Sequence, residues 1–196
     1  MTDHIPALDP AHATGKSKQL LDAVHAKLGV VPNLYRVFAH SPAAFEGFLH
    51  FGQALAGGVL DAKLREQIAL TVAEINDCDY CRAAHTFIGG KVGLSDRALT
   101  DARQARAADP RAAAILALAR DIVIQRGNLG EAGLQTARAA GLTDAEIIET
   151  VANVALNIFT NYTNHIARTV VDFPAAKPLE PVTTQTCATA GCGCGH

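Results

Sequence analysis

Apolar residues recur along most of the chain at intervals of three and four positions, the spacing of one face of an α-helix. In the segment 62–75, Leu64, Ile68 and Val72 follow this interval. The segment 111–126 repeats it, and no segment shows the sustained period-two alternation of a half-buried strand. The pattern predicts an all-α fold, a multi-helix bundle with no sheet.

Capping signals divide this pattern into separate helices. Ser17, Ser41-Pro42, Asp61 and Ser95 are typical helix starts, and the capping box Thr143-Asp144-Ala145-Glu146 opens another. Glycines after several apolar runs predict helix ends. The predicted helices span about 17–28, 34–39, 42–55, 62–75, 78–89, a short stretch after Ser95, 111–126, 131–139 and 144–170.

The longest predicted helix, which ends near Val170, carries its own apolar stripe. That stripe consists of Val151, Val154, Ala155, Ile158, Tyr162 and Ile166. Because an apolar stripe normally faces the core, we expect this one to do so. Along the whole chain, residues 1–14 are predicted to be an arm, 15–175 a helical domain, and 176–196 a Pro-punctuated linker with a Cys-rich tail.

Composition narrows the classes of protein. Hydrophobic residues make up 49% of the chain and charged residues 18%, which excludes an intrinsically disordered chain. The formal net charge is −2 and no basic stripe is visible, so we expect no nucleic-acid partner. No apolar run reaches the length of a membrane span and the N-terminus resembles no secretory signal, so we expect a cytoplasmic protein. Five cysteines there indicate redox or metal chemistry rather than structural disulfides.

The segment Cys78-Asp79-Tyr80-Cys81-Arg82-Ala83-Ala84-His85 concentrates this chemistry. Two cysteines one helical turn apart can form a disulfide, and a helix start stabilises a thiolate. His85 follows Cys81 by four positions, so the two share a helix face and can exchange a proton. Spacing alone leaves three interpretations open: a redox pair, part of a zinc site, and two ordinary core residues.

Two upstream carboxylates could assist the thiols. Glu74 precedes Cys78 by four positions and Glu66 by twelve. In one straight helix, twelve residues advance about 18 Å, which would leave Glu66 far from the sulfur atoms. A bend near Asn76-Asp77 would bring it back. Spacing does not choose between the two glutamates, and each could equally be a solvated surface charge.

These residues carry a resemblance to a known family. The run Leu64–His85, LREQIALTVAEINDCDYCRAAH, resembles the alkylhydroperoxidase D / carboxymuconolactone decarboxylase-like family. The peroxidase branch of that family has a Glu, eleven residues, and then C-x-x-C-x-x-x-H, which Glu66, Cys78, Cys81 and His85 match. The flanking segments Gly29–Asn33, Asn161-Tyr162 and Asp172–Pro174 also resemble it.

The resemblance implies an all-helical homo-oligomer, a trimer or hexamer, that reduces hydrogen peroxide or alkyl hydroperoxides. The sequence has no G-x-G-x-x-G or P-loop signature, so we expect no cofactor. The resemblance assigns peroxide attack to Cys81, a proton relay to Glu66 and His85, and disulfide closure to Cys78, with an external dithiol as reductant. Helix-terminus physics instead favours Cys78 as the more acidic thiol. Well-known members have a His immediately before the second Cys; Tyr80 stands there in this chain, and a phenol is a poor proton shuttle at neutral pH.

Other interpretations stay open beside the peroxidase. A carboxymuconolactone decarboxylase-like lyase would share the fold but would need no redox cysteines. A metal-binding or redox-sensing module could use the tail residues Cys187, Cys192, Cys194 and His196, because thiolates and imidazole suit zinc or copper(I). The same tail could also be incidental. His165 is predicted to be a hydrogen-bonded helix residue, with a pocket or subunit contact as the alternative.

Overall fold

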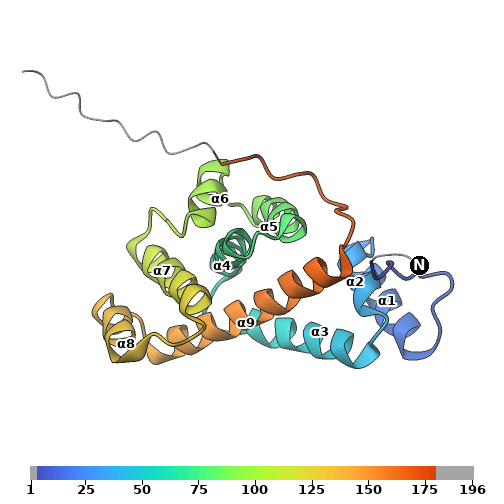
Figure 1. Ribbon diagram of the computed structural model, residues 1–196, viewed down its shortest axis with the longest axis horizontal. Helices are drawn as coiled ribbons and strands as arrows, with labels where there is room; N and C mark the ends of the chain where they lie inside the picture. The colour runs from blue at the N-terminus through green and yellow to red at the C-terminus, as the bar shows by residue number, and fades with distance from the viewer. Residues whose placement is uncertain (1–3, 180–196) are drawn as a thin grey trace, which may run out of the picture.

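The computed structural model describes residues 4–179, and within that range the chain is all-α (Figure 1). The helices are α1 (Gly15–Leu28), α2 (Asn33–Phe38), α3 (Pro42–Ala56), α4 (Ala62–Ile75), α5 (Asp79–Lys91), α6 (Asp96–Arg103), α7 (Pro110–Gln125), α8 (Gly130–Ala139) and α9 (Asp144–Ala167). The predicted fold class is therefore confirmed.

Helix α4 occupies the centre of the bundle. It contacts α5, α6, α7 and α9, which surround it in Figure 1. Its residues 67–73 are all buried, as expected for a helix that is covered on every side. Leu64, Ile68 and Val72, the apolar set read from the sequence, belong to one core cluster with residues of α7 and α9.

A second core cluster joins α1, α2 and α3 to α5. Its aromatic centre is Phe38 and Phe45, whose ring centroids lie 6.2 Å apart. Cys78 and Cys81 belong to this cluster, and each is only 2% exposed. The cysteine pair thus lies inside the bundle, where α5 meets the N-terminal helices.

Most predicted helix starts are confirmed by side-chain caps. Ser41, Asp61 and Ser95 each accept a hydrogen bond from the backbone N–H three residues ahead, and both bonds of the capping box that opens α9 are present. Ser17 is different, because α1 begins at Gly15 and the Ser17 hydroxyl donates to the Ala39 carbonyl at 2.6 Å. The prediction that Ser17 is the N-cap of this helix was therefore wrong.

Two predicted helix ends were also wrong. Helix α9 ends at Ala167 rather than near Val170, because Arg168 adopts a left-handed conformation with φ of 50°. Helix α5 continues through Gly89 and Gly90 to Lys91. A Cβ on Gly89 would lie 2.6 Å from the Leu99 side chain and 3.8 Å from Glu66 Cβ. This glycine lets α4 and α6 approach α5 closely and does not stop the helix.

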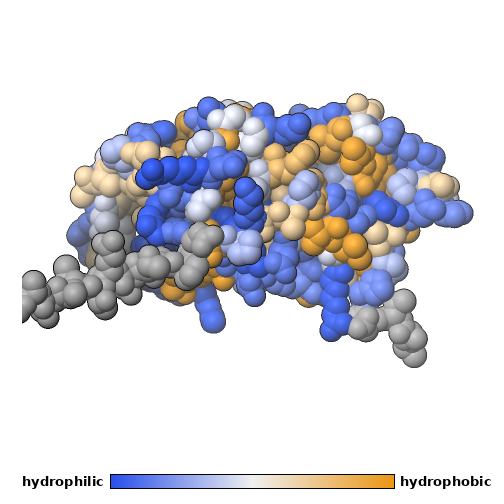
Figure 2. All heavy atoms as spheres, turned by 90° about the horizontal axis from the view of Figure 1, so that it is seen from above, coloured by the Kyte–Doolittle hydropathy of each residue, from blue (hydrophilic) through white to orange (hydrophobic). Residues whose placement is uncertain are grey.

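The face that carries α5 and α6 is mostly hydrophilic, with separate hydrophobic patches between the polar side chains (Figure 2). No helix within residues 4–179 has both the length and the apolar character needed to cross a membrane.

Candidate active site

The turn between α4 and α5 brings the site together. Asn76 ends α4, and Asp77 takes a left-handed conformation with φ of 53°, which Asp tolerates better than most residues. The Cys78 N–H then donates to the Ala73 carbonyl at 2.9 Å. The chain reverses here, so α5 packs back against α4. The predicted bend at Asn76-Asp77 is confirmed.

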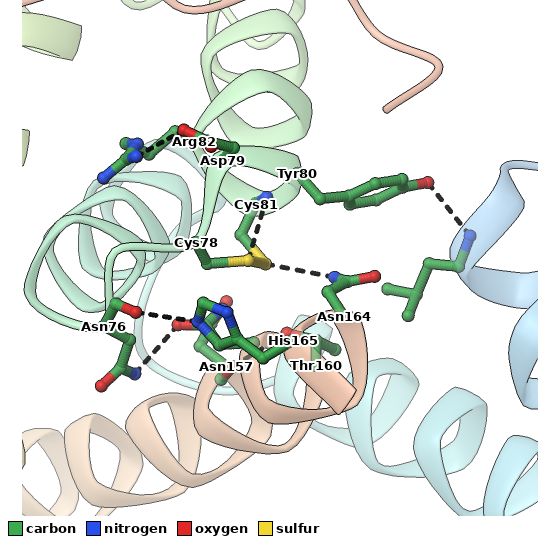
Figure 3. Close-up of a disulfide and its surroundings, with 12 residues drawn as sticks. Asn76, Cys78, Asp79, Tyr80, Cys81, Arg82, Asn157, Thr160, Asn164 and His165 are labelled. Carbon is green, nitrogen blue, oxygen red and sulfur yellow. Dashed lines mark hydrogen bonds and ion pairs between the residues drawn. A yellow bond between two sulfur atoms is a disulfide. The ribbon is translucent and has the colours of Figure 1, made fainter. Parts of the chain in front are cut away.

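The two cysteines form a disulfide at the start of α5 (Figure 3). Cys78 is the N-cap residue, and its sulfur accepts a hydrogen bond from the Cys81 N–H at 3.3 Å. Their Cα atoms lie 5.3 Å apart, within the range that a disulfide spans without backbone movement. The pair can therefore exchange between dithiol and disulfide in place.

Glu66 and His85 meet across the α4–α5 interface. The Glu66 Oε2 atom lies 2.8 Å from His85 Nδ1, and the side chains are only 18% and 21% exposed. A carboxylate on Nδ1 fixes the ring orientation and leaves Nε2 available for proton transfer. The structure thus brings Glu66 of α4 next to His85 of α5. The roles of these residues in catalysis stay predictions.

Glu74 has a different environment. Its Oε2 accepts from Arg103 Nε at 2.7 Å, and its Oε1 lies 3.9 Å from an Arg82 nitrogen. These ion pairs tie α4 to α5 and α6 and engage the Glu74 carboxylate with two arginines. Of the two glutamates that spacing left equal, geometry selects Glu66.

A cavity of about 460 Å³ lies beside Cys81 of the disulfide. It is lined mainly by apolar side chains, including Leu34, Phe48, Leu55, Phe87, Leu156 and Phe173. Its polar wall includes Glu66, His85 and the sulfur-bearing Cys81, whereas Cys78 does not line it in the described part of the chain. A molecule in this cavity would reach Cys81 and the Glu66–His85 pair together, and would not reach Cys78.

Tyr80 lines the same cavity, and its hydroxyl is tied to α2. Its hydroxyl accepts a hydrogen bond from the Leu34 N–H at 3.1 Å, and its ring packs edge-on against Phe173 at 5.7 Å between centroids. Burial raises the pKa of the Tyr80 phenol above its ordinary range. The hydroxyl therefore stays protonated and tied to α2, which does not suit a proton shuttle.

We expect Tyr80→Phe to lower the free energy of unfolding by about 1–3 kcal/mol, because the buried Leu34 N–H loses its partner. The rate at which peroxide oxidises the dithiol should stay within about twofold. Denaturant unfolding and stopped-flow oxidation measure the two effects. A large rate loss with unchanged stability would place Tyr80 in the relay instead.

Only part of the predicted apolar stripe of α9 faces the core, because Val154 is buried and Ile158 packs against the core cluster while other members are exposed. Within the predicted apolar stripe, Val151, Tyr162 and Ile166 are 43%, 53% and 73% exposed. The buried face of α9 is largely polar. It comprises Thr150, Asn153, Asn157, Thr160, Asn161 and Asn164, with the apolar residues Ile147, Val154 and Ala167 beside them. These polar residues recur at helical spacing in the sequence, but the general rule that apolar residues are buried does not identify them as a buried face.

Three residues of α9 form hydrogen bonds with Asn76 and Cys81, around the turn between α4 and α5 (Figure 3). Asn164 Nδ2 donates to Cys81 Sγ at 3.3 Å. Asn161 Oδ1 accepts from Asn76 Nδ2 at 3.0 Å, and His165 Nε2 lies 2.8 Å from the Asn76 carbonyl oxygen. The prediction of a hydrogen-bonded His165 is confirmed. The contact between Asn164 and sulfur was not foreseen.

Within residues 4–179, no group of three or more His, Cys, Asp or Glu side chains is arranged to hold a metal ion. The tail candidates Cys187, Cys192, Cys194 and His196 lie outside the described residues.

One family sequence model matches this chain over the segment that carries the site. Residues 42–121 match the sequence model of the carboxymuconolactone decarboxylase family, a segment that includes the dithiol, Glu66 and His85. No curated protein sequence matches the chain at a significant level.

Solved structures share the fold over nearly the whole domain. An alkylhydroperoxidase AhpD core, a peroxidase-related protein from Ralstonia eutropha JMP134, is 24% identical with a TM-score of 0.77, over 88% of this chain and 94% of that one. A peroxidase-related protein from Silicibacter sp. TM1040 is 20% identical with a TM-score of 0.74, over 87% and 92%. A variant of the debrominase Bmp8 in complex with 2,3,4-tribromopyrrole is 16% identical with a TM-score of 0.73, over 88% and 93%.

Proposed function

We propose that the chain is a thiol-dependent peroxidase of the alkylhydroperoxidase D / carboxymuconolactone decarboxylase-like family. The observation that carries the proposal is the cavity whose wall Cys81 shares with the Glu66–His85 pair. A nucleophile, a base held by a carboxylate, and a second thiol one turn away are the parts that this chemistry requires.

In the first step the Cys81 thiolate attacks the terminal oxygen of a hydroperoxide. An S–O bond forms and the O–O bond breaks, so that the sulfur is oxidised by two electrons to sulfenic acid. The leaving alkoxide takes a proton from His85, which Glu66 orients, and departs as the alcohol.

In the second step Cys78 closes the cycle. Its sulfur attacks Cys81 Sγ, the S–O bond breaks, and the hydroxyl group leaves as water with the Cys78 proton. The product is the disulfide that the structure contains. An external dithiol then returns two electrons and two protons by thiol–disulfide exchange. We place the reaction in the cytoplasm, a compartment that keeps such dithiols reduced.

The test is peroxide consumption by the full chain with a series of dithiol reductants. We expect turnover with hydrogen peroxide or with an organic hydroperoxide such as cumene hydroperoxide, and a Cys78–Cys81 disulfide when the reductant runs out. A chain that consumes neither peroxide, with both thiols still free by mass spectrometry, would overturn the proposal. Lactone decarboxylation by a chain with both cysteines replaced would support the lyase alternative.

The volume of the cavity, about 460 Å³, and its mainly apolar lining favour organic hydroperoxides over hydrogen peroxide. Gly52 of α3 lies on its wall, and a Cβ there would approach Leu156 at 3.8 Å. We expect Gly52→Leu to lower kcat/KM for cumene hydroperoxide about tenfold or more by filling the cavity, and to leave hydrogen peroxide within about twofold. Initial rates with both substrates measure this.

Gly47 provides the matched control, since it lies on the same helix, is exposed, and has open space around its Cβ position. Gly47→Leu should change neither rate. Equal losses for both peroxides in Gly52→Leu would indicate damage to the fold rather than exclusion of the larger substrate.

Self-association is the second part of the proposal. Ile148, Tyr162 and Ile166 of α9 are 67%, 53% and 73% exposed, and with Val151 and Ala155 they form a continuous apolar face. A second copy of the chain, in a trimer or hexamer, would bury this face. We expect Ile166→Glu to shift the protein to smaller species in size-exclusion chromatography with light scattering. A wild-type chain that is monomeric at micromolar concentration would contradict it.

A further inference from the structure

The two sulfur atoms of the dithiol have different hydrogen-bond donors. Cys78 Sγ accepts the Cys81 N–H at the start of α5, so the helix-terminus effect acts on Cys78. Cys81 Sγ accepts instead from Asn164 Nδ2, at 3.3 Å across the α5–α9 interface (Figure 3). The cysteine that faces the cavity therefore depends on a side chain for its donor.

Asn161 and Asn164 differ from the other buried polar side chains of α9, because Asn161 bonds to Asn76 and Asn164 bonds to the Cys81 sulfur. Thr150, Asn153, Asn157 and Thr160 each donate to a carbonyl of their own helix, a local arrangement that satisfies the side-chain donor. Asn164 is 5% exposed, its donor goes to sulfur, and its Oδ1 atom is buried with no hydrogen-bond partner in the structure. A buried amide oxygen without a donor costs folding free energy.

An apolar residue at this position would avoid that cost. Among the described residues, the one hydrogen bond that the Asn164 side chain makes is the one to the Cys81 sulfur. A disulfide sulfur is a weak, neutral acceptor, whereas a thiolate carries a full charge and accepts a stronger, charge-assisted hydrogen bond. The same N–H therefore stabilises the reduced, ionised Cys81 more than it stabilises the disulfide.

We propose that Asn164 is a catalytic residue whose side-chain N–H stabilises the Cys81 thiolate at the expense of the stability of the fold. The Asn164 N–H donates a hydrogen bond to Cys81 as the helix-terminal N–H does to Cys78. The cavity-facing sulfur is thereby stabilised as the thiolate that attacks the peroxide. The inference rests on the proposed function for its link to peroxide, but the thiolate itself can be measured without any peroxide.

The test compares the reduced full chain with Asn164→Leu, using iodoacetamide alkylation of Cys81 as a function of pH, resolved by mass spectrometry of the Cys81 peptide. We expect the Cys81 pKa to rise by about one unit, which reduces the thiolate fraction roughly tenfold well below the pKa. The reduction potential, measured above both pKa values, should become more negative by about 30 mV. The melting temperature should stay unchanged or rise.

Asn157→Leu is the matched control, because it makes the same exchange on the same buried face, at a residue that donates to its own helix. It should leave the Cys81 pKa unchanged. Asn164→Asp, nearly isosteric, replaces the donor by an oxygen and should also raise the Cys81 pKa, which keeps the test valid if the leucine variant does not fold.

A folded Asn164→Leu or Asn164→Asp with an unshifted Cys81 pKa would overturn the inference. So would a clear loss of stability without a pKa change, because Asn164 would then serve packing only. If the Cys81 pKa shifts as expected and the wild-type chain consumes no peroxide, the donor role of Asn164 stands and the proposed peroxidase function fails.

Discussion

Cys81→Ser should abolish peroxide consumption, with a loss of at least about a thousandfold, because a serine hydroxyl is neither ionised nor nucleophilic near neutral pH. The structural reason to choose Cys81 is that it lines the cavity whereas Cys78 caps a helix behind it. Steady-state turnover with a dithiol reductant measures the effect.

Cys78→Ser should behave differently. Peroxide should still convert Cys81 to sulfenic acid, but no neighbouring thiol can then close the disulfide. A sulfenic-acid-selective probe should label Cys81 in this variant and leave the motif unlabelled in Cys81→Ser. Site-resolved mass spectrometry separates this signal from the cysteines of the tail.

The reverse labelling pattern would make Cys78 the nucleophile. In that case the helix terminus, which acts on Cys78 through the Cys81 N–H, would outweigh the side-chain groups around Cys81. The cavity and the relay would then face the resolving thiol, and Cys78 and Cys81 would exchange roles in the two steps.

Local signals were sufficient to predict most of the fold and the central motif. Helix caps at Ser41, Asp61 and Thr143 depend only on residues within one turn, and the bend at Asn76-Asp77 depends on two residues that favour caps and turns. These features could be read from the sequence because the physics that fixes them is local.

Features that depend on contacts between distant segments could not be read in this way. The choice of Glu66 over Glu74 follows from the close approach of α4 and α5 at Gly89 and from the arginines that hold Glu74 elsewhere. The buried polar side chains of α9 form hydrogen bonds partly with the backbone of their own helix and partly with Asn76 and Cys81. These two residues are 83 to 85 positions away in sequence. An apolar stripe left exposed on α9 is consistent with a subunit interface that a single chain does not contain.

Disrupting the Glu66–His85 pair should cause the second largest loss of peroxidase activity, after replacement of Cys81. We expect Glu66→Gln to slow Cys81 oxidation about 10²- to 10⁴-fold, the usual contribution of general acid–base catalysis. Glutamine keeps the size of the side chain and its contact with His85 Nδ1, but it removes the charge that stabilises the protonated ring. Stopped-flow oxidation of the reduced protein measures the step without interference from the reductant.

Glu74→Gln is the matched control, since Glu74 lies on the same helix but pairs with Arg103. It should reduce stability slightly and keep the oxidation rate within about twofold. Combining Glu66→Gln with His85→Asn should cost little more than either change alone, because residues that act as one unit are not additive. Losses that multiply in the double variant would show instead that Glu66 and His85 act separately, each through its own contact with the cavity.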